Sequence, residues 1–161
     1  MPVSTTLGGL AAGLLIYGLA PETEGHGTDA TLIAFHRNNG RMRARVPFVK
    51  TLVSAITIGT GGSGGREGPT AQIASGAGAI IGQLFKLPDD ERRIVILIGM
   101  AAGLSAIFKS PLGTAIFAVE ILYSRMAIEG AALIFTMISA SIAYSISGLF
   151  SRYTPRFLLP A

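Results

Sequence analysis

The 161-residue sequence contains no cysteine, and only 14% of its residues are charged. The lack of cysteine excludes disulfide bridges and thiolate metal sites, although it leaves the cellular compartment open. Soluble proteins carry about 25% charged residues, whereas half of this chain is hydrophobic and its mean hydropathy is +0.55. The composition therefore predicts a multi-pass integral membrane protein surrounded by lipid, which we expect in the plasma membrane.

The few basic residues are grouped rather than spread. Arg37, Arg41, Arg43, Arg45 and Lys50 fall close together in what we interpret as one polar connection. Such a group favours a cytoplasmic loop over a nucleic-acid surface. The apolar start of the chain, residues 1–20, lacks the basic region of a secretory signal and is interpreted as the end of a membrane helix.

Apolar runs broken by glycine and proline predict an all-α fold of about seven helices in one incomplete membrane domain, 1–161, with a polar tail at 152–161. Several predicted helices are too short to cross about 30 Å of hydrocarbon, which is typical of transporters whose broken or re-entrant helices meet at a midplane site. We expect Thr28 or Asp29 to cap the second helix, and Asp89 or Asp90 the fifth. The predicted helices are Leu7–Leu19, Thr28–Phe35, Val46–Ile58, Glu67–Leu84, a helix from about Asp89 that carries Ile94–Phe108, Pro111–Tyr123 and Ala131–Phe150.

A glycine-rich turn at 59–69 carries the only charges between Thr51 and Phe85, namely Arg66 and Glu67. Pro69 suits the first turn of a helix, and glycines such as Gly64 and Gly65 let backbone amides face a ligand. An ionisable residue at membrane depth is a functional candidate by default. The turn therefore predicts a ligand site.

A helix N-terminus binds anions because its first amides are unpaired and its dipole is positive there. Arg66, Glu67 and Gly68 supply those amides. The Glu67 carboxylate is itself an anion, so it competes with a mobile anion when ionised and leaves the site when protonated. The alternative is that Glu67 pairs with an arginine and only fastens the turn.

A soluble alternative is also open to test. Residues 59–64 match the dinucleotide fingerprint G-x-G-x-x-G, but no second strand and no suitably spaced acid follow. A phosphate-binding P-loop fails because no Lys-Ser or Lys-Thr follows the glycines. The residues indicate no metal, no organic cofactor and no enzymatic activity.

The sequence resembles the chloride channel (CLC) family of voltage-gated channels and chloride/proton antiporters. Residues 65–69, Gly-Arg-Glu-Gly-Pro, match its G-[K/R]-E-G-P motif, and residues 101–112 resemble the stretch A-A-G-x-x-A-x-F-x-x-P-L. The resemblance implies that Glu67 is the gating glutamate, that the amides of Arg66, Glu67 and Gly68 line an anion site beside Gly64, Gly65 and Pro69, and that the full-length protein is a homodimer transporting chloride. We expect the dimer contact within Leu112–Leu122 and Ala131–Phe150.

The first departure from the family lies at residues 25–29. The family usually has G-S-G-I-P, whose serine touches the anion, whereas this chain has Gly-His-Gly-Thr-Asp. His26 would take the serine position beside Gly27. A histidine there either contacts the anion or is hydrogen-bonded near a membrane surface.

Two further departures concern coupling and length. Many family exchangers carry a Glu-Glu pair after the short proline-led helix, whereas this chain has Glu120 and Ile121. Isoleucine cannot hold a proton, which favours a passive channel over a proton-coupled antiporter. The sequence resembles only the first of two inverted halves, so conduction needs the missing half. A nonconducting remnant that only associates with other membrane helices is the remaining alternative.

Overall fold

The computed structural model describes residues 2–123 and 130–151, and every regular element in this part of the chain is a helix. It contains no strand, so a dinucleotide cradle beneath a parallel sheet is excluded for the described residues. The predicted polar tail lies outside them. The helices are α1 Pro2–Leu19, the 3₁₀ helix η1 Pro21–Thr23, α2 Thr28–His36, α3 Arg45–Gly59, α4 Glu67–Leu84, α5 Asp89–Phe108, α6 Pro111–Tyr123 and α7 Gly130–Ser151.

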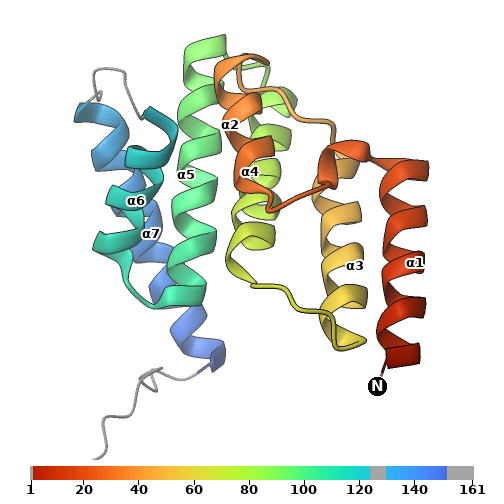
Figure 1. Cartoon of the computed structure of the whole chain (residues 1–161). Helices are drawn as coiled ribbons and strands as arrows, with labels where there is room; N and C mark the ends of the chain where they lie inside the picture. Colours follow the sequence, from red (N-terminus) through yellow and green to blue (C-terminus); the bar gives the residue numbers. More distant parts are fainter. Residues whose placement is uncertain (1, 124–129, 152–161) are drawn as a thin grey trace, which may run out of the picture.

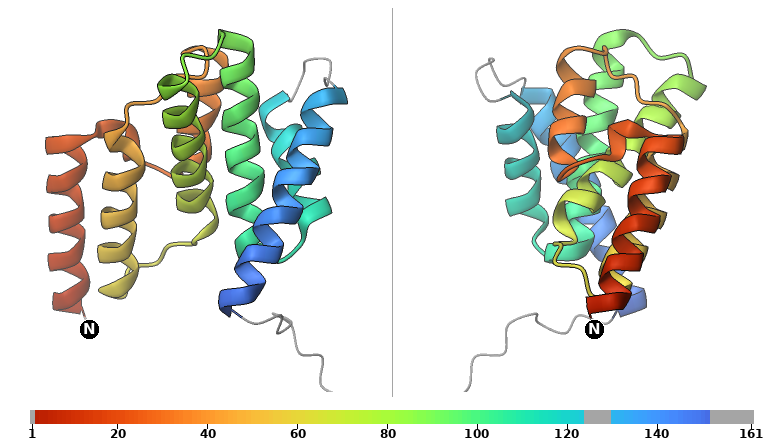
Figure 2. Two further views of the ribbon diagram at one scale, coloured as in Figure 1. Left: turned by 180° about the vertical axis from the view of Figure 1, so that it is seen from behind. Right: turned by 45° about the vertical axis from the view of Figure 1, so that its right-hand side comes forward.

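The helices stand side by side with most of their axes running between the same two ends of the molecule (Figure 1). α4 and α5 form the centre, α1 packs with α3 on one flank, and α6 and α7 pack with α5 on the other. α2 is short and lies against α4. The two further views in Figure 2 show the same order and the extended connection from α3 to α4.

The predicted helix order is confirmed, and α5 has the predicted bounds. α1 is longer than the sequence suggested, because it begins at Pro2 rather than Leu7. α1 and α7 are long and apolar enough to cross a membrane, whereas α6 is a shorter apolar helix. The described part of the chain therefore combines helices of spanning length with a shorter apolar helix.

Both predicted helix caps are wrong. The N-cap of α2 is Gly27, in the left-handed conformation at φ 98°, and no side chain caps the helix. A Cβ on Gly27 would lie 2.6 Å from the carbonyl oxygen of Gly68. The N-cap of α5 is Pro88, while Asp89 forms an ion pair with Arg92 instead. At α2, contact with another helix leaves no space for a capping side chain.

Small residues let α4 and α5 approach until backbone meets backbone. A Cβ on Gly78 would lie 2.5 Å from the Val95 carbonyl oxygen, and one on Gly99 would overlap the Ala74 carbonyl oxygen. The small residues of α4 thus form a packing surface, as is usual for helices in membranes.

Serine hydroxyls join α5 to α7. Ser105 Oγ donates to the Ala140 carbonyl at 2.7 Å, and Ser147 Oγ donates to the Ala106 carbonyl at 3.2 Å. Each such bond is worth about 0.6 kcal/mol in a membrane protein. These bonds fix α7 against the central pair without placing a charge between the helices.

Candidate anion site at two helix N-termini

The turn between α3 and α4 brings the chain back to the start of α4. α3 ends at Gly59, and the Gly62 amide donates to the Thr57 carbonyl at 2.8 Å. Gly61 has φ 89°, a left-handed conformation that favours glycine. A Cβ on Gly64 would meet nothing within 4 Å. Gly61 is thus needed to form the turn, whereas Gly64 borders open space.

The first turn of α4 presents unpaired backbone amides. Arg66 is the N-cap, and α4 begins at Glu67, with Pro69 in the first turn. The amides of Arg66, Glu67 and Gly68 donate to no carbonyl within the described residues. Unpaired amides at the positive end of a helix are the donors that suit an anion.

A second helix N-terminus abuts the first. A Cβ on Gly68 would overlap the carbonyl oxygen of His26, and Gly27 in turn lies against the Gly68 carbonyl. The N-termini of α2 and α4 are therefore in direct backbone contact, which only glycine at positions 27 and 68 allows. The structure brings together His26, Gly27 and Gly68, three predicted site residues from distant parts of the sequence.

An open cavity of about 810 Å³ lies at this junction. The Glu67 side chain is exposed on its wall and turns back toward Gly65. Glu67 forms no ion pair in the part of the chain that the structure describes, so the arginine-fastened alternative is not what is observed there. The predicted residues His26, Gly64, Gly65, Glu67, Gly68 and Pro69 all line this cavity.

Lys50, predicted to lie in a polar loop, also lines the cavity. It lies within α3, is only 4% exposed, and is not part of a polar loop. Its Nζ donates to the carbonyls of Thr23 and Gly25 at 2.7 and 2.8 Å. The available signal was its position as the single charge in the apolar run 46–58. A buried cation needs such acceptors to offset the cost of burial.

A second cavity, of about 730 Å³, lies on the other side of the η1–α2 turn. Glu22 and Arg43 form an ion pair on its wall. Partial burial raises the pKa of the Glu22 carboxyl, but the hydrogen bond and charge of Arg43 outweigh it, so the pKa lies below its ordinary value. Asp29, predicted as a cap, lines this cavity instead.

These features define an all-helical protein of membrane-like composition in which two helices, α2 and α4, begin beside a shared cavity. The chain belongs to the voltage gated chloride channel family, since the family model matches residues 8–160. That membership agrees with the all-helical fold and the membrane composition.

Curated relatives support the same family. The chain is 32% identical to the voltage-gated ClC-type chloride channel ClcB of Shigella flexneri and 33% identical to ClcB of Escherichia coli O81 (strain ED1a). Each match covers 93% of this chain but 35% of the relative, so the chain spans about a third of their length. No solved structure matches the chain.

The contact between the two N-termini can be tested by adding one methyl group. We expect Gly68→Ala in the full-length protein to weaken chloride binding by about tenfold or more, because the new Cβ must displace the His26 carbonyl. Isothermal titration with chloride measures this change. Gly9→Ala on α1 is the matched control, since its Cβ meets nothing within 4 Å and Gly9 does not line the cavity, and equal affinities for the two variants would contradict the assigned contact.

Proposed function

We propose that the full-length protein carries chloride or a similar small anion across the plasma membrane as a passive channel. The observation that carries this proposal is the meeting of the α2 and α4 N-termini at a cavity that Glu67 also lines. Two helix ends provide unpaired amides without a full positive charge in contact with the ion. Membership in the voltage gated chloride channel family supports the same anion.

Within this proposal Glu67 is the gate. Its carboxylate reaches back over the N-terminus of its own helix, where it competes with the mobile anion. Protonation removes that competition, so acid favours the open site. His26 lies on the same wall, where its ring can donate a hydrogen bond to the anion.

The channel mechanism is favoured over proton exchange by the sequence at the end of α6. Glu120 is exposed and Ile121 is partly buried. If Ile121 occupies the family's proton-acceptor position, no side chain there can carry a proton. Proton-coupled exchange through the neighbouring Glu120 is the competing mechanism, and the flux experiment below separates the two.

Two further partners are proposed, one from the length of the chain and one from its exposed apolar surface. Because the chain spans about a third of its relatives' length, we assign the other wall of the anion pathway to the second half of a channel core. We place a homodimer contact on the outer faces of α6 and α7, where large apolar side chains are exposed. These side chains are Leu112, Ile116, Phe117, Ile134, Phe135, Ile138, Ile142 and Ile146.

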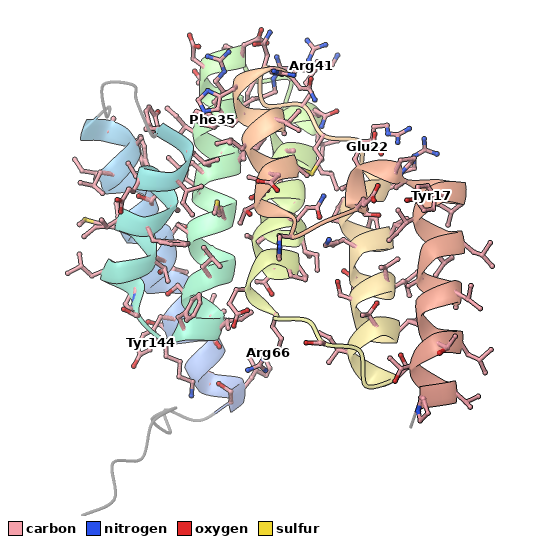
Figure 3. The ribbon with its side chains drawn as sticks, viewed as in Figure 1. Tyr17, Glu22, Phe35, Arg41, Arg66 and Tyr144 are labelled. Carbon is pink, nitrogen blue, oxygen red and sulfur yellow. The ribbon has the colours of Figure 1, made fainter. Side chains whose placement is uncertain are left out.

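The distribution of basic residues sets the orientation. Arg41 lies at one end of the molecule and Arg66 near the other (Figure 3). The loops at the Arg41 end also carry most of the other described basic residues, and basic loops face the cytoplasm. We therefore place the Glu67 end of the cavity toward the outside. The basic residues at the Arg41 end are Arg37, Arg41, Arg43, Arg45, Lys86, Arg92 and Arg93.

The mechanism predicts chloride flux without proton flux. In liposomes holding the full-length protein, a chloride gradient should drive anion efflux while the internal pH stays constant. Simultaneous recording with a chloride electrode and a pH dye measures both. Uphill proton movement driven by the chloride gradient would show that the protein is a proton-coupled exchanger and not a channel. If the liposomes released no anion, the proposal of anion transport would be rejected.

The gate predicts the effect of Glu67→Gln in the full-length protein. Glutamine cannot ionise, so the variant should conduct with no dependence on pH between about 3 and 5.5, a range that spans the ordinary pKa of glutamate and lies below that of histidine, the residue type that His26 adds to the same cavity. The wild-type protein should conduct more at the acidic end. Planar bilayer recording measures this, with Glu91→Gln as a control on an exposed helix start. Persistent pH dependence in Glu67→Gln would remove Glu67 from the gate.

The orientation can be read from single cysteines in the full-length protein, because residues 1–161 contain none and any cysteine elsewhere can be replaced by serine. We expect a membrane-impermeant maleimide added to intact cells to label Ser63→Cys and to leave Asn38→Cys unlabelled until the membrane is permeabilised. Ser63 lies in the α3–α4 turn and Asn38 beside Arg37 in the basic loop. The reverse labelling pattern would invert the assigned topology.

A further inference from the structure

Gln72, on α4, has no role in the site as described so far. Its side chain is completely buried. Nε2 donates to the carbonyl of Glu22 at 2.8 Å, whereas Oε1 has no hydrogen-bond partner in the described part of the chain. Gln72 therefore spends its donor on a backbone carbonyl 50 positions away in the sequence.

Gln72 contacts both ends of the turn that leads into α2. It holds the carbonyl of Glu22 before the turn, and a Cβ on Gly27 after the turn would lie 3.0 Å from its Oε1. Lys50 holds the middle of the turn through the carbonyls of Thr23 and Gly25. The 22–27 turn is therefore fixed by one side chain from α4 and one from α3.

These bonds decide which side of the turn faces the cavity. Three carbonyls, those of Glu22, Thr23 and Gly25, are committed to side-chain donors. The amides of Gly25 and His26 have no acceptor among the described residues, and both residues line the cavity. A carbonyl oxygen turned toward the cavity would repel an anion, whereas an amide attracts it.

We infer that Gln72 is a positioning residue that orients the 22–27 turn so that its amides face the anion. The inference rests on the proposed anion transport. Gln72 lines the second cavity and not the one at the helix N-termini, so it acts through the turn rather than by touching the ion. Its amide donor is uncharged, so it fixes the Glu22 carbonyl without adding a second charge beside Lys50.

Gln83 provides a control from the same helix. Its Nε2 also donates to a loop carbonyl, that of Met42, at 2.7 Å. It does not line the cavity at the helix N-termini. Loss of the Gln83 bond should therefore affect the fold near the basic loop but leave anion binding unchanged.

The test compares Gln72→Met, Gln72→Asn and Gln83→Met in the full-length protein in liposomes. Methionine keeps the length of the side chain and removes the donor, whereas asparagine keeps the amide but is too short to reach Glu22. We expect both Gln72 variants to raise the half-saturating chloride concentration by about tenfold and to change the chloride/nitrate flux ratio, with maximal flux changed less. Gln83→Met should match the wild type in both measurements.

Thermal unfolding in detergent shows which variants are folded, and one folded Gln72 variant is sufficient for the test. The inference would be overturned if a folded Gln72 variant had the wild-type half-saturating chloride concentration and the wild-type chloride/nitrate flux ratio. It would also be overturned if Gln83→Met raised the half-saturating chloride concentration as much as the Gln72 variants do. In both cases an active wild type leaves the proposed transport intact. A wild-type protein that carries no anion would overturn the proposed transport and this inference with it.

Discussion

The structure depends on one close contact, in which the backbone at Gly68 meets the backbone at His26 and Gly27. Two helix N-termini repel each other through their dipoles, so they come together only when something compensates for that repulsion. Three features offset this repulsion here. The two helix ends pack through glycine backbone rather than through side chains, the 22–27 turn is held in place by other residues, and the ends leave a space where the proposed anion can lie. α4 takes its position from the glycine contacts with α5, and α2 takes its position from α4. The central helix pair is thus the frame on which the site is built.

The sequence predicted most of the helices because each begins or ends at a proline, a glycine or a charged group. Pro111 and the apolar run after it predicted α6 correctly, and Glu67 marked the first residue of α4. The caps were predicted wrongly because capping was judged from local side chains alone. At Gly27 the deciding factor is a carbonyl from a residue 41 positions further along the chain, and no local pattern contains that information.

For the candidate site, too, features set by neighbouring residues in the sequence could be predicted, whereas features set by distant residues could not. The turn at 59–69 indicated an anion site because its own residues supply the amides. The roles of Lys50 and Gln72 could not be predicted, since both depend on carbonyls in a segment distant in sequence. Lys50 was visible as an isolated charge, but its neighbours along the chain made it resemble a continuation of the basic loop. Gln72 is an ordinary helix residue by propensity, and only its burial distinguishes it.

The location of the unpaired amides is itself an argument for the site. In hydrocarbon an unsatisfied backbone group costs several kcal/mol, so membrane helices satisfy nearly all of them internally. Here the serines of α5 and α7 and the Lys50 side chain bond to carbonyls, while Gly25, His26, Glu67 and Gly68, whose amides are unpaired within the described residues, line one cavity. A membrane protein can retain such a cluster where water or an anion reaches it. In the proposed mechanism, the Glu67 carboxylate serves the same amides when the anion is absent, so the proposed gate would follow from the hydrogen-bonding requirement of the helix ends.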